Sequence, residues 1–199
     1  MKNEIDKAFE ITKKEKRPAL ISFTVAGDNT SKKSFEILKS ISNTIDIAEW
    51  GIAFNCPGAD GPEIQNSSYR AIKNGITLDS TFSLIKKYKK LKNSKPLILM
   101  GYYQLIYNYG EKKFIKKCKN VGVAGLIVVD LPWPDNKSFA KLCKKNSICF
   151  VQLIAPTTTK KRMKLIVKDS HELIYQVSNV NITGGKLKST TKTILNNYK

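Results

Sequence analysis

The feature that most constrains the fold is an alternation, along the whole chain, of short apolar runs with lysine-rich amphipathic segments. The apolar runs are rich in β-branched residues, which is typical of buried parallel strands. They cover residues 19–25, 45–51, 96–103, 125–132, 149–156 and 172–178. Parallel strands need a crossover, usually a helix, between them, so the pattern predicts repeated βα units.

The segments between the runs have helical periodicity. One helix is predicted directly after Thr30, and another around residues 134–146, where Asp135 or Asn136 is expected to cap the start. No GxGxxG motif follows the first strand, which argues against a dinucleotide-binding sheet. The pattern therefore predicts an α/β fold of the (β/α) barrel type, in which working groups lie at the carboxyl ends of the strands.

Length and composition limit the function classes. A chain of 199 residues with 41% hydrophobic content is enough for one core, so residues 1–199 are predicted to form a single domain. The N-terminus is charged, and no apolar run reaches about 18 residues, which predicts a cytoplasmic protein without membrane contact. The four cysteines form no CxxC pair and His171 stands alone, so we expect reduced thiols and no metal.

The chain is strongly basic, with 35 Lys and Arg against 16 Asp and Glu, a net charge of +19. Such a charge suits a polyanion partner. However, Arg17, Arg70 and Arg162 are the only arginines, and lysines are spread over every predicted helix. Since arginine is the residue suited to bidentate phosphate and base recognition, a solvated lysine surface is the favoured interpretation. A basic anion-binding or nucleic-acid-binding protein remains an alternative.

Two carboxylates flank the turn in "EWGIAFNCPGADGPEIQ", residues 49–65. Glu49 lies near the carboxyl end of the second predicted strand, and Asp60 lies in the loop that follows. Burial raises the pKa of a carboxyl group toward neutrality, which suits a general acid/base. Two other interpretations stay open. In one, Glu49 turns outward or caps a backbone group; in the other, Asp60, before Gly and Pro, is a turn residue or helix cap.

The same stretch resembles the signature of the tryptophan synthase alpha chain family. Further segments resemble that family in the same order along the chain, from about residue 15 to the end. They are "FTVAGD" (23–28), "LMGYYQLIYNYG" (99–110), "GVAGLIVVDLP" (122–132) and "YQVSNVNITGG" (175–185).

The resemblance implies a TIM-barrel lyase of tryptophan biosynthesis that cleaves indole-3-glycerol phosphate to indole and glyceraldehyde 3-phosphate, without metal or organic cofactor. Glu49 matches the family's acid/base, which protonates the indole C3 and removes the proton of the neighbouring hydroxyl. Asp60 matches the carboxylate that stabilises the positive charge of the indole N–H.

The resemblance also implies substrate-binding residues and a partner. Tyr175 matches a residue beside the substrate, and Phe23, Met100 and Ile127 match apolar positions around the indole ring. Thr183 and Gly184 match a loop that closes over the substrate. The implied partner is a tryptophan synthase beta chain, which carries pyridoxal phosphate, in an α2β2 heterotetramer. Tyr102 and Tyr103 match positions near the lip that joins this partner.

The sequence departs from the family at several positions and in length. The departures are Ala53, Asn55, Cys56, Gln104 and Asn181. A barrel of this type takes about 250 residues, so we expect an incomplete barrel of about six βα units in which units seven and eight are missing. Because those units usually supply part of a phosphate site, the 199-residue chain alone is expected to be poorly active. A catalytically impaired relic that only binds or activates the beta subunit is a second alternative.

Overall fold

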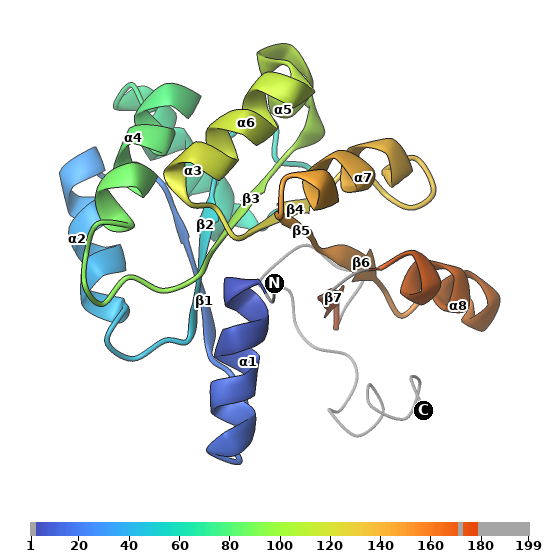
Figure 1. Cartoon of the computed structure of the whole chain (residues 1–199). Coiled ribbons are helices and arrows are strands. Elements are labelled where there is room, and N and C mark those ends of the chain that lie inside the picture. The colour runs from blue at the N-terminus through green and yellow to red at the C-terminus, as the bar shows by residue number, and fades with distance from the viewer. Residues whose placement is uncertain (1–2, 171–172, 179–199) are drawn as a thin grey trace.

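The structure is a computed structural model that describes residues 3–170 and 173–178. In these residues, strands and helices alternate along the chain (Figure 1). The strands are β1 (Ile21–Val25), β2 (Ile47–Gly51), β3 (Leu97–Gly101), β4 (Gly125–Val128), β5 (Cys149–Phe150), β6 (Gln152–Ile154) and β7 (Ile174–Gln176). The helices are α1 (Glu4–Lys14), α2 (Ser31–Ile41), α3 (Pro62–Lys73), α4 (Leu78–Tyr88), α5 (Tyr103–Tyr109), α6 (Glu111–Val121), α7 (Lys137–Lys145) and α8 (Lys160–Asp169).

The first five strands form a parallel sheet in chain order, β1-β2-β3-β4-β5, and β6 pairs in parallel with β7. The sheet curves, with α2 to α7 on its convex side and α1 on its concave side (Figure 1). Parallel strands that pair in sequence order and are joined by helices are the arrangement of a TIM barrel wall, which confirms the predicted fold class. The single-domain assignment stays a prediction because residues 179–199 lie outside the described part.

Alternate residues of each strand enter two separate apolar clusters. On the outer face, Trp50 and Leu99 pack with the helices that cover the sheet. On the inner face, Ile47, Ile98 and Ile127 pack together with residues of α1. This period of two follows from the pleat of a strand, and it explains why β2 is buried on both faces and reads as a continuous apolar run.

The observed strands are shorter than the predicted ones; the run 125–132, for example, is a strand only over Gly125–Val128. Two of the differences have a clear cause in hydrogen bonding. The predicted strand 96–103 ends at Gly101, because the backbone N–H of Tyr103 donates to a carboxylate oxygen of Asp130 and begins helix α5. The predicted strand 149–156 is divided into β5 and β6. Val151 N–H still donates to a carbonyl of β4, whereas the Gln152 N–H donates to the Leu173 carbonyl, so hydrogen bonding changes from one neighbouring strand to the other.

The predicted helix starts agree with the structure in position, but at one of them the expected side-chain capping bond is absent. Thr30 caps α2, because its side chain accepts a hydrogen bond from the Lys33 N–H at 3.0 Å. Asn136 is the N-cap residue of α7, yet its side chain makes no capping bond. It donates instead to Gln152 Oε1 at 2.9 Å and to the Leu131 carbonyl, so a buried contact with β6 takes precedence over the cap.

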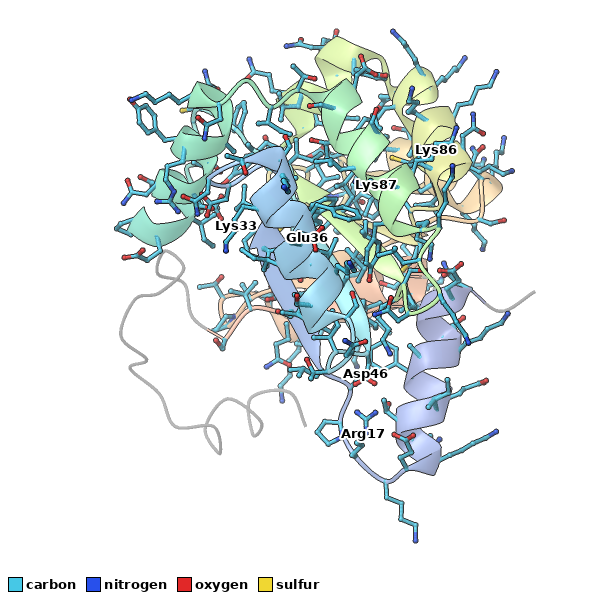
Figure 2. All side chains as sticks on the ribbon, turned by 90° about the vertical axis from the view of Figure 1, so that its left-hand side faces the viewer. Arg17, Lys33, Glu36, Asp46, Lys86 and Lys87 are labelled. Atoms are coloured by element: carbon cyan, nitrogen blue, oxygen red, sulfur yellow. The ribbon has the colours of Figure 1, made fainter. Side chains whose placement is uncertain are left out.

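The three arginines join segments that are distant in sequence. Arg17 makes a bidentate contact with Asp46 at the base of β2, where Figure 2 shows the two side chains together. Arg70 of α3 holds Asp28 of the β1–α2 loop in the same way. Arg162 of α8 donates to the Trp133 carbonyl. The side chains best suited to phosphate or base recognition are therefore engaged within the fold.

Candidate active site

Glu49 is the central residue of β2 and faces the inner side of the sheet. In the parallel register it pairs with Phe23 of β1 and Ile98 of β3, so it is flanked by apolar side chains. The residue is 6% exposed, and no described residue donates a hydrogen bond to its carboxyl group. Loss of hydration disfavours the charged form, and burial raises the pKa of Glu49 to about 7. The alternatives that Glu49 turns outward or caps a backbone group are therefore wrong.

Asp60 lies in the loop between β2 and α3 and is 5% exposed. The Tyr102 hydroxyl donates to Asp60 Oδ2 at 3.0 Å and accepts from the Ala59 N–H at 3.1 Å. Burial raises the pKa of Asp60, while the bond from Tyr102 acts in the opposite direction because it stabilises the carboxylate. Asp60 is thus a carboxylate with a fixed donor, in contrast to Glu49.

The loop around Asp60 is fixed by backbone contacts rather than by a helix cap at Asp60. Gly61 is the N-cap residue of α3, and Pro62 occupies the first turn, where a missing N–H is tolerated. Gln65 Nε2 donates to the Asp60 carbonyl oxygen at 2.8 Å. The carboxylate itself points to Tyr102, so the helix-cap interpretation of Asp60 is wrong.

The predicted apolar residues share the inner face with Glu49. Phe23 pairs directly with Glu49, and Met100 pairs with Ile127 one step closer to the carboxyl ends of the strands. A Cβ atom at Gly51 would lie 2.7 Å from Phe23 Cζ, so the absence of a side chain there gives the Phe23 ring its place. The sheet therefore brings these side chains together around one apolar space.

Tyr175 of β7 belongs to the same inner face. It pairs with Leu153 and is 41% exposed. Burial raises the pKa of Tyr175, and the nearby charge of Glu49 raises it further, which indicates that the two side chains are close. The other predicted binding residues, Thr183 and Gly184, lie outside the described residues.

Tyr102 is the residue whose contribution sequence reasoning missed. The resemblance places it near the lip with Tyr103, which stays a prediction. In the structure its hydroxyl lies between Asp60 and Ala59, and its ring stacks on Phe54 with the ring centroids 4.9 Å apart. Burial raises the pKa of Tyr102, with the carboxylate of Asp60 adding to the shift, so its hydroxyl stays a proton donor. The one available signal was its place directly after β3, beside the loop that leaves β2.

Other kinds of site find no support in the described residues. Nowhere among them do three His, Cys, Asp or Glu side chains gather as a metal ion requires. The four cysteines form no disulfide in the structure, and burial raises the pKa of Cys118 and Cys143. No helix in residues 3–170 has the length and hydropathy needed to cross a membrane.

Comparison with known proteins places the chain in a family. The family model "Tryptophan synthase alpha chain" matches residues 9–197. A tryptophan synthase alpha chain from Pelagibacter ubique is 58% identical over 194 residues, which are 98% of this chain and 73% of the relative.

Solved structures agree. The alpha subunit from Legionella pneumophila aligns with a TM-score of 0.89 at 28% identity, over 100% of this chain and 73% of that one. A chain in the tryptophan synthase α2β2 complex from Pyrococcus furiosus aligns with a TM-score of 0.77 at 36% identity, over 81% of this chain and 68% of that one. The chain belongs to the tryptophan synthase alpha chain family.

Proposed function

We propose that the chain cleaves indole-3-glycerol phosphate to indole and glyceraldehyde 3-phosphate, with Glu49 as the proton carrier and Asp60 as a fixed negative charge. The observation that carries this proposal is the environment of Glu49. A carboxyl group with a pKa of about 7 exists in both protonation states near neutral pH, which is what a group that gives and takes protons requires.

The proton balance of the reaction closes on one carboxyl group. Protonated Glu49 donates its proton to the indole C3, and the ring nitrogen becomes a positively charged N–H. The Glu49 carboxylate then accepts the proton of the hydroxyl on the adjacent carbon. The carbon–carbon bond breaks, its electrons return to the indole ring, and Glu49 is protonated again. The reaction therefore consumes no external acid or base.

Asp60 must stay ionised, unlike Glu49, because only a negative charge stabilises the positively charged indole N–H. The hydrogen bond from Tyr102 supports its ionised form and fixes the oxygen in place. Phe23, Met100 and Ile127 supply an apolar surface for the indole ring, and Tyr175 lies beside Glu49. Thr183 and Gly184 are proposed to close over the substrate and hold its phosphate.

The proposed partner is a beta chain that carries pyridoxal phosphate, whereas the alpha reaction itself needs only proton transfer. The α2β2 assembly of the Pyrococcus furiosus relative supports this. The exposed loop residues Asn55 and Cys56 are the proposed contact. We place the reaction in the cytoplasm, where free thiols persist.

Neither alternative is favoured. A nucleic-acid-binding function loses support because all three arginines are engaged within the fold. Figure 2 shows the lysines of α2 and α4 interspersed with an acidic side chain, Glu36. A non-enzymatic relic would have no use for a desolvated carboxyl group on the inner face, because burying a carboxyl without a partner opposes folding.

The experiment is a Glu49→Gln substitution followed by an assay of indole release. Glutamine is nearly isosteric but transfers no proton near pH 7, so turnover should fall by about 10²- to 10⁴-fold. Glu63→Gln, an exposed change on α3, is the matched control and should keep wild-type turnover. Retention of more than about a tenth of kcat by folded Glu49→Gln would refute the assignment.

A further inference from the structure

Helix α1 enters the inner side of the sheet. The other helices of the first four βα units pack against the convex side, whereas α1 lies on the concave side (Figure 1). Its residue Ile5 is 1% exposed and packs in the same cluster as Ile47, Ile98 and Ile127. The inner space is therefore closed in part by a residue from outside the sheet.

Ile5 occupies a place that the sheet leaves empty. Gly125 of β4 pairs with Ile98 of β3, which in turn pairs with Glu49 of β2. A Cβ atom at Gly125 would lie 2.8 Å from Ile5 Cδ1. The Ile5 side chain thus fills, on the inner face beside Ile98, the position that a side chain at residue 125 would otherwise hold.

Polar contacts fix the helix at the end where Ile5 lies. Asn3 Oδ1 accepts from the Ile5 N–H at 3.2 Å, and Asn3 Nδ2 donates to the carbonyl of Ala124, the residue before β4, at 3.0 Å. Glu4 binds Lys89 at 2.8 Å. Because the bond from Asn3 Nδ2 to the Ala124 carbonyl joins the helix start directly to the start of β4, the position of Ile5 over Gly125 is set by this hydrogen bond as well as by packing.

We infer that Ile5 is a positioning residue that closes the apolar space beneath Glu49 and keeps water away from its carboxyl group. This inference rests on the proposed function of Glu49. The residues paired with Glu49 on β1 and β3 are the apolar Phe23 and Ile98, and Ile5 of α1 packs in one buried cluster with Ile98. Desolvation by burial raises the pKa of Glu49, and the charge of Glu49 in turn raises the pKa of Tyr175 on β7. Exclusion of water is then the main control on the protonation of Glu49.

The test is a pH titration of the Glu49 carboxyl by NMR, with ¹³C-labelled glutamate carboxyl groups and Glu49→Gln to assign the signal. Ile5→Ala opens the space beneath Glu49 to water, so the titration midpoint should fall by about one pH unit toward the ordinary range. Ile85→Ala is the matched control. It deletes the same atoms from a fully buried residue, but in the outer cluster, and should leave the midpoint unchanged while also lowering the melting temperature.

Ile5→Val provides a milder variant and should give a smaller shift in the same direction. An unchanged midpoint in the folded Ile5 variants would overturn the inference, as would an equal shift in Ile85→Ala. The titration needs no turnover, so the two proposals fail separately. An active Glu49→Gln enzyme would refute the catalytic assignment and leave a shifted midpoint in Ile5→Ala intact.

Discussion

Strand β2 and the loop that follows it carry the two carboxylates in contrasting surroundings. Glu49 on the strand has apolar neighbours on both sides and a pKa of about 7. Asp60 in the loop is equally buried but accepts a hydrogen bond from Tyr102. Burial raises the pKa of both carboxyl groups, but only at Asp60 does a fixed donor oppose the rise and favour the charged form.

The largest effect that separates the two regions is expected from Asp60→Asn. The substitution removes the charge that stabilises the intermediate but leaves the proton carrier in place. Turnover should fall by about 10²-fold, less than in Glu49→Gln. Parallel steady-state assays of the two variants measure the difference. Equal and complete losses would mean that Asp60 also moves a proton.

A second prediction concerns stability. The pKa of Glu49 is raised in the folded state, from 4.5 to about 7. Between these values the folded state binds more protons than the unfolded state, so stability declines as the pH rises through this window. Glu49→Gln removes that dependence. The free energy of unfolding of Glu49→Gln minus that of wild type should therefore be larger at pH 8 than at pH 4.5, by up to roughly 3 kcal/mol.

Denaturant unfolding at the two pH values measures this change, and the comparison cancels the constant effect of burying an amide. Glu63→Gln serves as the exposed control, for which no such pH-dependent gain is expected. A difference for Glu49→Gln that stays flat with pH would show that the native carboxyl has an ordinary pKa.

A smaller effect is expected from Tyr102→Phe. The substitution keeps the ring that stacks on Phe54 but removes the donor to Asp60 and the acceptor for the Ala59 N–H. A hydrogen bond to a charged group contributes about 1.5 to 3 kcal/mol, of which the smaller value corresponds to roughly ten-fold. Because the charge of Asp60 itself is kept, turnover should fall by an amount near this lower limit, about ten-fold. The pKa of Asp60 should rise, which moves the acidic limb of the pH–rate profile to higher pH. Tyr107→Phe, on an exposed residue of α5, is the control and should change neither.

The smallest effect is expected from salt. The net charge of +19 lies largely on surface lysines, whose mutual repulsion opposes folding. Raising the salt concentration from about 0.1 to 1 M shortens the screening length from about 10 to 3 Å, so the melting temperature should increase by a few degrees. The ratio of wild-type to Asp60→Asn turnover should stay constant, because that buried charge is screened little. A ratio that changes with salt would indicate that surface charge contributes to the site.

The strands were predictable because most of them, such as β2 and β4, are buried on both faces and therefore read as largely apolar runs. Their ends were not. The start of α5 depends on Asp130 reaching the Tyr103 N–H, and the division between β5 and β6 depends on a change of hydrogen-bond partner at Gln152. Such contacts join distant segments, and local sequence does not encode them.

The site was predictable to a similar extent. The carboxylates near the end of a predicted strand and in the loop after it pointed to Glu49 and Asp60, and family resemblance gave each a role. The raised pKa of Glu49 follows from neighbours on two other strands, and the bond between Tyr102 and Asp60 joins residues 42 positions apart. The position of Ile5 over Gly125 likewise appears only once α1 is placed on the inner face.

The most direct test of the account is the titration of the Glu49 carboxyl in the wild-type protein, followed by ¹³C NMR and assigned with Glu49→Gln. The account predicts a midpoint near pH 7, because apolar neighbours replace the water that would stabilise the charge. A midpoint near 4.5, the ordinary value for glutamate, would contradict it, since a permanently ionised carboxylate could not donate the proton that begins the cleavage.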